Sequence, residues 1–382
     1  MCMLKVVQVS WNWINESGGA AQSILNFSRV FNSTVISFTK KCGRPYLGSE
    51  STKQVHIPYN ESAVNRYAYT RSHIKKQAED LLVHADLIII HGFYRYHFDW
   101  AVNIATKNKI PYWIIPHGSL DPFVFSYRTL AKKIWFIFRG NNGFASANRV
   151  VFATESERDK SNIPISPEKS IIVNWPVAPV NTECVSEAKM RVRSEHNIPI
   201  DAKVLLFIGR FHPMKRPIET INAVAGCNSD VVYLMMMGPD SDVLTAAECE
   251  KHCTNHGYKN ICFIKPVYSQ KKYEFYMAAD AFISLSYREN FGYTVAEALS
   301  TGIPVILSPG NDLSKDVRLL NCGWLLLNDN LDDATKAIKA FIATPNKLLA
   351  EMGRRGQQWA HEELSFEMFN SKIRAAQLLK KS

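Results

Sequence analysis

The sequence DAFISLSYRENFGYTVAEAL at residues 280–299 decides the fold of the second half of the chain. Its first seven residues form an apolar run with the length and composition of a buried strand. Gly292 then breaks the chain, and residues 294–301 follow as a helix. A strand that leads through a glycine turn into a helix is typical of a βαβ unit, and repeated βαβ units build a parallel sheet.

The turn between this strand and this helix also predicts a binding site. The backbone N–H groups from Asn290 to Thr294 come at a helix N-terminus, where unpaired N–H groups bind phosphate. Glu289 lies at the mouth of the helix and Glu297 lies inside it. Two carboxylates beside an anion need partners of their own, and sugar and ribose hydroxyls are suitable because they donate hydrogen bonds to carboxylates. A diphosphate flanked by two sugars fits this arrangement.

The length and composition of the chain predict a two-domain globular protein. It has 382 residues, which suits two domains of roughly 150–200 residues each. No apolar run approaches the ~18–20 residues that span a bilayer, and the N-terminal MCMLKVVQVS lacks the features of a signal peptide. The eight cysteines form no disulfide framework, which agrees with a reducing compartment. We therefore expect a cytoplasmic protein.

The net charge of +10 is unevenly shared between the two halves. Residues 1–180 contain 21 Lys and Arg against 12 Asp and Glu, a net charge of about +9, whereas residues 181–382 contain 24 against 23. A basic first half suggests a surface that faces anions, either a phospholipid leaflet, an acidic acceptor or nucleic acid. The alternative, that the excess charge only keeps the protein soluble, stays open.

Short apolar runs alternate with helical patterns along the whole chain. The candidate strands are LKVVQVS, VISFT, DLIIIHG, YWIIPHG, RVVFAT and SIIVNW in the first half, and KVLLFIG, VVYLMMMG, NICFIKPV, AFISLS, PVILSP and GWLLL in the second. The alternation predicts an α/β fold with two Rossmann-like parallel sheets. We expect an N-terminal domain at 1–176, a linker with a short helix at 177–202, a C-terminal domain at 203–345, and C-terminal helices at 346–382 that cross back to the first domain.

Two cations follow the first strand of the second half, in GRFHPMKRP at residues 209–217. Arg210 comes directly after the strand, and Lys215 precedes a helix that starts near Pro217. At the carboxyl edge of a sheet they suit a diphosphate, Arg as a planar fork and Lys as a point charge. Either residue alone would more often be a solvated surface charge, but the acidic motif at the same edge favours the functional interpretation.

The first half offers weaker candidates at corresponding positions. In WNWINESGGAAQSI, Gly18 and Gly19 open a helix whose amides can face a ligand, although glycines needed only for a tight turn look the same. His117 follows the strand YWII in IPHGSLDP, where its imidazole either faces a ligand or is hydrogen-bonded within the loop. His91 and Gly92 follow DLIII in a similar place and are supported by that position alone.

The stretch CEKHCTNHGYKNIC contains residue types that bind zinc, but its spacing matches no common zinc pattern. It is also an ordinary helix leading into a strand, so we expect no metal site from its candidate ligands, Cys249, His252, Cys253, His256 and Cys262.

The stretch SYRTLAKKIWFIFRG at residues 126–140 mixes cations with aromatic residues, namely Lys132, Lys133, Arg139, Trp135, Phe136 and Phe138. It predicts either an interfacial helix that contacts a membrane or a helix that packs on its own sheet.

Four motifs in order, the Gly-Gly loop, IPHGSLDP, GRFHPMKRP and the two glutamates eight positions apart, resemble family-4 retaining glycosyltransferases of the GT-B fold. The resemblance covers nearly the whole chain and is strongest to bacterial enzymes of exopolysaccharide, O-antigen and capsule assembly. It implies two Rossmann-like domains that face each other across a cleft, the first for the acceptor and the second for the nucleotide-sugar donor.

The resemblance also implies roles for individual residues. Arg210 and Lys215 would hold the donor diphosphate, with Gly19 approaching the phosphate, Glu289 contacting the transferred sugar and His117 lying beside it at the reacting centre. The further implied contacts are those of Glu297 with the ribose, of the amides around Phe291 and Gly292 with phosphate and sugar, and of the backbone near Val267 with the base. Two departures stand out, Arg216-Pro217 where the family often has Gly, and Asn174-Trp175-Pro176 where it often has Asn-Gly, which leaves the hinge geometry open.

The implied function is transfer of a sugar from a UDP- or GDP-sugar to a saccharide acceptor, lipid-linked in surface polysaccharide synthesis, without a metal or other cofactor. Peripheral contact with anionic lipid at the inner face of the plasma membrane is a further hypothesis. One alternative is a nucleotide-sugar epimerase of the same fold. A nucleic-acid-binding protein is a second alternative, but the sequence lacks the aromatic platforms and recognition-helix pattern of that class, so nucleic acid is not an expected partner.

Overall fold

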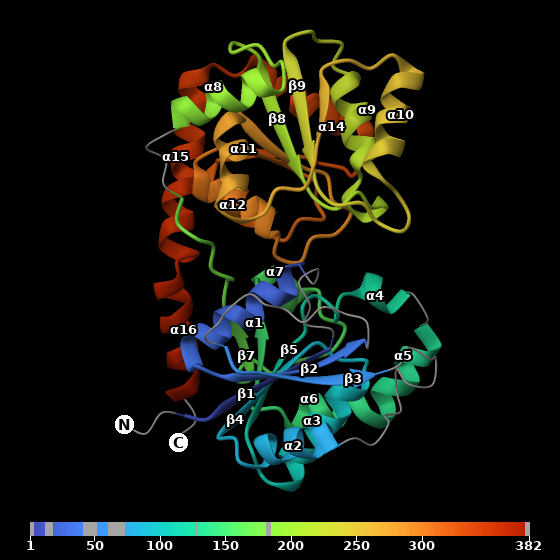
Figure 1. Ribbon diagram of the computed structural model, residues 1–382, viewed down its shortest axis with the longest axis vertical. Coiled ribbons are helices and arrows are strands. Elements are labelled where there is room, and N and C mark those ends of the chain that lie inside the picture. Colours follow the sequence, from blue (N-terminus) through green and yellow to red (C-terminus); the bar gives the residue numbers. More distant parts are fainter. Residues whose placement is uncertain are drawn as a thin grey trace. The chain divides into compact units, whose positions relative to one another are not determined.

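The structure is a computed structural model. It describes residues 4–11, 18–40, 52–59, 73–126, 129–180 and 185–378. The chain forms two compact units (Figure 1). Unit 1 comprises Met1–Trp175 and Phe369–Ser382, and unit 2 comprises Pro176–Met368.

Unit 1 contains, within the described residues, a seven-stranded parallel sheet in the order β3-β2-β1-β4-β5-β6-β7. Its strands are β1 (Val6–Trp11), β2 (Thr34–Lys40), β3 (Gln54–Tyr59), β4 (Leu87–His91), β5 (Tyr112–Ile115), β6 (Arg149–Phe152) and β7 (Ser170–Ile172). Its helices are α1 (Gly18–Phe31), α2 (His73–Val83), α3 (Tyr96–Lys107), α4 (Pro122–Ser126), α5 (Thr129–Trp135), the π-helix η1 (Phe136–Gly140), α6 (Asn141–Ser146), α7 (Glu155–Asp159) and the end of α16 (Phe366–Leu378).

The helices of unit 1 cover both faces of this sheet, so alternate residues of a strand enter different layers. In β1, Val7 and Val9 join the core formed with α2, α3 and α6. Gln8 lies on the opposite face, where its side chain contacts α1. Figure 1 shows α2, α3 and α6 together on one side of the strands and α1 on the other. A polar side chain in the middle of β1 is therefore directed into a specific layer of the unit.

Unit 2 contains, among its described residues, a six-stranded parallel sheet in the order β10-β9-β8-β11-β12-β13. The strands are β8 (Lys203–Ile208), β9 (Val232–Met237), β10 (Ile261–Ile264), β11 (Ala281–Ser284), β12 (Val305–Leu307) and β13 (Gly323–Leu325). The helices are α8 (Val185–Glu195), the 3-10 helices η2 (Pro213–Lys215) and η3 (Ser269–Lys271), α9 (Pro217–Ala225), α10 (Ala246–His256), α11 (Lys272–Ala278), α12 (Tyr293–Thr301), α13 (Ser314–Leu320), α14 (Leu331–Ala343) and α15 (Asn346–Glu363).

The two-sheet α/β architecture expected from the sequence is confirmed, but one strand was not predicted. All twelve apolar runs named above coincide with strands, whereas β3 was missed. Among the described strands, β3 has only β2 as a neighbour, and it contains Pro58. Proline is tolerated on a strand of this kind because no ladder hydrogen bond is needed on its free side. The residues of an edge strand are therefore less apolar and less easily recognised.

Residues expected in the linker include a helix that is anchored in unit 2. Arg193 of α8 is buried, and its guanidinium donates to the carbonyl oxygens of Ala278, Ile200 and Ala202 and to the carboxylate of Asp280. A buried guanidinium with every partner in one unit fixes its helix to that unit. The C-terminal segment is divided instead: α15 belongs to unit 2, and α16 from Phe369 onward belongs to unit 1.

Both sheets reverse their strand order at one place, between β1 and β4 in unit 1 and between β8 and β11 in unit 2. In doubly wound sheets ligands bind outside the carboxyl ends of the strands at this switch point. The loops that follow these four strands are therefore the first places to look for a site.

Candidate functional site

Two residues from separate motifs meet at the switch point of unit 2. Lys215 lies in η2, after β8, and Glu289 follows β11. The ammonium of Lys215 donates to Oε2 of Glu289, across 74 positions of sequence. Both side chains remain partly exposed. The pair is therefore formed by neighbouring strands of one sheet and is accessible to a ligand.

The backbone of Glu289 is held by the loop after β12. Its N–H donates to the carbonyl of Gly310 at 2.8 Å, and its carbonyl accepts from the N–H of Asp312 at 3.0 Å. Asn311, between them, is buried and donates to the carbonyl of Ser284 at 3.0 Å. These contacts fix the position of Glu289. These contacts were not predicted from the sequence, although turn residues directly after PVILSP were an available signal.

The helix N-terminus predicted beside Glu289 is present. Helix α12 begins at Tyr293, and its N-cap residue Gly292 supplies no side-chain cap. Gly292 has φ +75°, and a Cβ there would lie 3.0 Å from Cγ of Glu289, so a larger residue would be strained and would crowd the carboxylate. Asn290 is half-buried and Phe291 is buried before the helix starts. The first amides of α12, at Tyr293 and Thr294, thus lie next to the charged pair without a side-chain cap.

Glu297 lies inside α12 and is already paired by α11. Its Oε1 accepts from the ammonium of Lys272 at 2.5 Å, and its Oε2 accepts from the hydroxyl of Tyr276 at 3.0 Å. Burial and the neighbouring Glu297 carboxylate raise the pKa of Tyr276 well above its usual value, so this hydroxyl stays a donor. Each carboxylate oxygen can accept a second hydrogen bond, which leaves capacity for ligand hydroxyls.

Further cationic and open polar groups lie along the same loops. Arg210 is exposed, and among the described residues no hydrogen-bond partner of its guanidinium is found. Partial burial lowers the pKa of His212, and the charges of Arg210 and Lys215 lower it further. The backbone N–H and C=O of Val267, after β10, likewise have no backbone partner within the described ranges. Arg210 and the backbone of Val267 are therefore available to a ligand.

Arg216 explains one departure from the family pattern. It has φ +54°, in the left-handed region that glycine adopts without cost, and its guanidinium pairs with Asp329. The chain thus keeps the turn that glycine commonly makes, with an arginine that has its own partner.

In unit 1, His117 lies in a constrained loop after β5. It has φ +51° and precedes Gly118, whose N–H donates to Glu157 at 2.6 Å. The second oxygen of Glu157 accepts from the N–H of Ala153 after β6, at 2.7 Å. The ring nitrogen Nε2 of His117 lies 3.1 Å from Nδ1 of His91. Burial lowers the pKa of His117 to about 4, so its ring is neutral at neutral pH.

The glycine pair opens α1 as expected, since the helix begins at Gly18 and Gly19 is exposed in its first turn. The loop before it, residues 12–17, lies outside the described residues. The proposed approach of Gly19 to a phosphate therefore stays a prediction.

The candidate zinc ligands between Cys249 and Cys262 do not converge on one point in unit 2. Cys249 and Cys253 are buried in the core beneath α10, and Nε2 of His252 lies 2.8 Å from Oδ1 of Asn222. Within the described ranges, no group of three or more His, Cys, Asp and Glu is placed to hold a metal ion.

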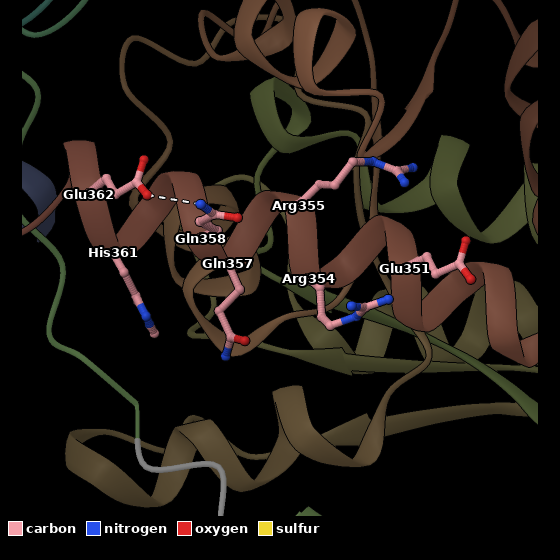
Figure 2. Close-up of a pocket in the computed structure, with 7 residues that line it drawn as sticks. All are labelled: Glu351, Arg354, Arg355, Gln357, Gln358, His361 and Glu362. Atoms are coloured by element: carbon pink, nitrogen blue, oxygen red, sulfur yellow. Dashed lines mark hydrogen bonds between the residues drawn. The ribbon is translucent and has the colours of Figure 1, made fainter.

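A polar hollow of about 590 Å³ lies along α15, and none of the site residues named above lines it (Figure 2). Several of its side chains have structural roles. Arg355 donates to the carbonyls of Leu320 and Asn321 at the end of α13, and Gln357 donates to the carbonyl of Ser300. Gln358 donates to Glu362 one turn along the same helix. These bonds hold neighbouring helices together, so the hollow does not compete with the switch-point loops as a site.

Residues 189–359 match the model of the family glycosyl transferases group 1. The matched segment lies within unit 2 and includes Arg210, Lys215, Glu289 and Glu297. It therefore covers the switch-point loops described above.

Similar proteins include the D-inositol 3-phosphate glycosyltransferase 2 of Catenulispora acidiphila, 28% identical over 181 residues, which are 45% of this chain and 42% of the relative. The GDP-mannose:cellobiosyl-diphosphopolyprenol alpha-mannosyltransferase of Xanthomonas oryzae is 20% identical over 347 residues, 88% of this chain and 87% of the relative. The alignments with the first curated relatives span about half of those relatives' length.

Among solved structures, HepE from Anabaena in complex with UDP and glucose has a TM-score of 0.78 and 15% identity, and the match covers 98% of this chain and 100% of HepE. A likeness at this identity concerns the fold. The chain therefore has the two-domain GT-B fold of glycosyltransferases, and residues 189–359 of its second unit match glycosyl transferases group 1.

Proposed function

We propose that the protein is a retaining glycosyltransferase of family 4 that moves a sugar from a UDP- or GDP-sugar to a saccharide acceptor. The observation that carries the proposal is the contact of Lys215 with Glu289 at the β8–β11 switch point, beside the N-terminus of α12. A cation, a carboxylate and free amides at one place can bind a diphosphate and the hydroxyls of the sugar attached to it.

In this proposal unit 2 binds the donor. Arg210 and Lys215 neutralise the diphosphate, and the amides of α12 add the dipole of a helix N-terminus. Glu289 accepts hydrogen bonds from the transferred sugar and Glu297 from the ribose, while the open backbone of Val267 faces the base. Because the carboxyl group of Glu289 is held by Lys215, it is suited to bind hydroxyls and not to attack the anomeric carbon.

The proposed reaction is front-side displacement. The bond from the anomeric carbon to the diphosphate oxygen breaks, and the bond to the acceptor oxygen forms on the same face of the sugar. The proton of the acceptor hydroxyl passes to the departing diphosphate oxygen, so no protein base is needed. The protein contributes positioning and charge stabilisation of the leaving group, and we propose that it uses no metal ion.

The comparisons support a nucleotide-sugar donor and leave two nucleotides open. The mannosyltransferase of Xanthomonas is named for GDP-mannose and a diphosphopolyprenol acceptor, whereas HepE was solved with UDP and glucose. We propose a lipid-linked saccharide as acceptor and a role in bacterial surface polysaccharide synthesis.

The test is a thermal-shift screen of UDP- and GDP-sugars, followed by a product assay with each stabilising donor, with and without saccharide acceptors. A glycosyltransferase forms a new glycoside only with acceptor, and the product keeps the anomeric configuration of the donor. Conversion of the donor to an epimer without acceptor would establish the epimerase alternative instead. Stabilisation by none of the nucleotide sugars would contradict both.

We also propose that unit 1 contacts anionic lipid through α5 and η1, with the protein at the cytoplasmic face of a membrane. Leu130, Ile137 and Phe138 are 65 to 74% exposed there, whereas Phe136 is buried in the core. Large apolar side chains gathered on one short segment are unusual on a surface that faces only water. Within the described ranges, no helix combines the length and apolar character that crossing a bilayer requires.

The cations of this segment are not equivalent. Arg139 pairs with Asp99, and Lys132 donates to the carbonyl of Val124, whereas Lys133 is exposed. A groove of about 870 Å³ opens beside Phe138 and Arg139 and is lined largely by α3. The exposed apolar side chains support a proposed contact in which apolar insertion adds to charge.

A further inference from the structure

The side chain of Gln8, in the interior of unit 1, has one orientation that satisfies its neighbours. Its Nε2 lies 3.1 Å from the carbonyl oxygen of Ile24 and 2.8 and 2.7 Å from the hydroxyl oxygens of Ser28 and Ser33. The hydroxyl of Ser28 donates to the carbonyl of Ile24, and that of Ser33 donates to Ser28. Three oxygens thus face the amide nitrogen, and its two N–H groups are shared among them, which places the nitrogen toward them and Oε1 on the other side.

The orientation of Gln8 determines the tautomer of His91. Oε1 of Gln8 lies 2.7 Å from Nε2 of His91. An amide oxygen only accepts, so the proton of His91 is on Nε2. Burial, and then the neighbouring His117 and His97, lower the pKa of His91 well below its usual value, so the ring is neutral. Its Nδ1 is consequently an acceptor.

The same reasoning extends to His117. Its Nε2 lies 3.1 Å from Nδ1 of His91. The ring centroids are 5.3 Å apart, close to the largest separation that this N···N distance allows, so the nitrogens meet edge to edge. Ser23 also presents an acceptor to Nε2 of His117. Its hydroxyl donates to the carbonyl of Ala20, and its oxygen lies 3.5 Å from this nitrogen. Two acceptors face Nε2 of His117, which must donate.

We propose that Gln8 and His91 are positioning residues that hold the proton of His117 on Nε2, so that Nδ1 accepts a hydrogen bond from a sugar hydroxyl. Among the described residues, no partner of this Nδ1 is found. The identity of the ligand rests on the proposed function, whereas the tautomer does not. A neutral acceptor binds a hydroxyl without attracting the diphosphate, which an imidazolium would do.

The tautomer can be observed directly, without substrate. Long-range ¹H–¹⁵N correlation spectra of protein labelled with ¹⁵N-histidine distinguish protonated from unprotonated ring nitrogens. At pH 7.5 we expect unaveraged Nε2–H signals for His91 and His117. In His91→Phe, the His117 signals should move toward averaged values. A proton on Nδ1 of His117 in the wild type, an imidazolium, or unchanged His117 signals in His91→Phe would overturn the relay.

Activity then tests which nitrogen of His117 is used. The amide oxygen of an asparagine reaches about the place of Nδ1, and that of a glutamine about the place of Nε2. We expect His117→Asn to keep at least about tenfold more kcat/KM than His117→Gln, the value of one net hydrogen bond. Asparagine also tolerates the positive φ at this position. Equal or better activity of His117→Gln would overturn the assignment of Nδ1.

The positioning role is tested by restoring only the acceptor of His91. We expect His91→Phe to lower kcat/KM about tenfold and His91→Asn, with an amide oxygen near Nδ1, to recover most of the loss. No recovery in a folded His91→Asn would contradict the role of His91. A wild type that neither binds nor uses any nucleotide sugar would overturn the proposed function and the ligand assigned to Nδ1, while the spectra would still decide the tautomer.

Discussion

The two units share the order of six strands, to which unit 1 adds β7, and they differ in the chemistry at their switch points. In unit 2 the loops after β8 and β11 carry ionised groups, with Lys215 paired to Glu289. In unit 1 the corresponding region around β1, β4 and β5 carries Gln8, His91 and His117, which are buried or half-buried and neutral. The same strand order thus presents charged side chains in one unit and neutral side chains in the other.

This difference separates the contribution of the sheet to a binding site from that of the side chains. A switch point supplies a place where loops diverge, whereas the side chains decide what can bind there. Charges suit a diphosphate that must be held and stabilised as a leaving group. Neutral acceptors suit a hydroxyl that must be oriented. The predictions below test this division, beginning with the largest expected effect.

Replacing either member of the charged pair should nearly abolish transfer. We expect Lys215→Ala and Glu289→Ala each to lower kcat/KM about a hundredfold to a thousandfold, because loss of one charged contact at a reacting centre costs ~3–4 kcal/mol. Since the two side chains contact each other, the double variant should lose less than the sum of the single losses. The measurement is steady-state kinetics with the donor identified by the screen.

Lys251, exposed on α10, is the matched control, and Lys251→Ala should keep wild-type kinetics. Thermal unfolding of each variant checks that the fold is intact. Near-normal turnover of a folded Lys215→Ala would show that the pair is not part of the donor site.

Acid should destabilise unit 1 before unit 2. The pKa values of His97 and His117 are lowered by burial to about 4 in the folded state. The unfolded chain therefore takes up these protons first, and stability that is complete above about pH 6.5 is lost as the pH falls toward 4. The expected loss is about 2 kcal/mol for each histidine by pH 5. In unit 2, His212 and His252 have a lowered pKa but are only partly buried.

Hydrogen exchange at pH 7.5 and pH 5, corrected for intrinsic rates, measures this for each unit separately. Protection should fall mainly in the strands of unit 1. Earlier loss in the strands of unit 2 would contradict the contrast between neutral and ionised switch points.

Lipid binding should be a property of unit 1. Wild-type protein should sediment with anionic liposomes more than with neutral ones, and less as salt shortens the Debye length to ~8 Å. Replacing Phe138 by Ser should weaken binding by about 1–3 kcal/mol through lost apolar burial, and neutralising Lys133 by about 1 kcal/mol. Leu319, 76% exposed on α13 of unit 2, provides the control Leu319→Ser, which should have no effect. Equal binding to both kinds of vesicle would refute the electrostatic part.

Chelation of metal ions should leave the activity unchanged, which is the smallest of the expected effects. If Arg210, Lys215 and the amides of α12 neutralise the diphosphate, activity in excess EDTA should equal that without it. Complete loss in EDTA, restored by manganese or magnesium, would mean that the cations of unit 2 are insufficient for the leaving group.

Local patterns in the sequence were sufficient to predict the architecture. The apolar runs that form the strands are contiguous, and the turn at Gly292 has a simple steric reason. The prediction failed at β3. This strand pairs with β2 and contains Pro58, and an edge strand of this kind needs fewer apolar residues than a central one. At residues 126–140 the sequence left two interpretations open, and the structure divides the segment: Phe136 packs inward while Phe138 is exposed.

The candidate site could be predicted only in part. Lys215 and Glu289 follow strands of one sheet, so their placement at a common edge followed from topology, but their direct contact depends on loop conformation. The support from the loop that contains Asn311 joins residues of different loops, so the turn residues after PVILSP mark that loop but not the residues that it contacts. The orientation of Gln8 requires knowledge of which face of β1 meets α1, and that information is contained in the packing of the unit.

Because α16 returns to unit 1, the two units can complete their folding at different times during synthesis. Phe369 packs on Phe27 and Trp175, and Arg374 donates to the carbonyl of Val30, so the last turns of the chain complete the layer around α1. All of unit 2 precedes these turns in the sequence. A chain emerging from the ribosome can therefore finish unit 2 while unit 1 still exposes Phe27 and Trp175, which makes unit 1 the later unit to fold although it is begun first.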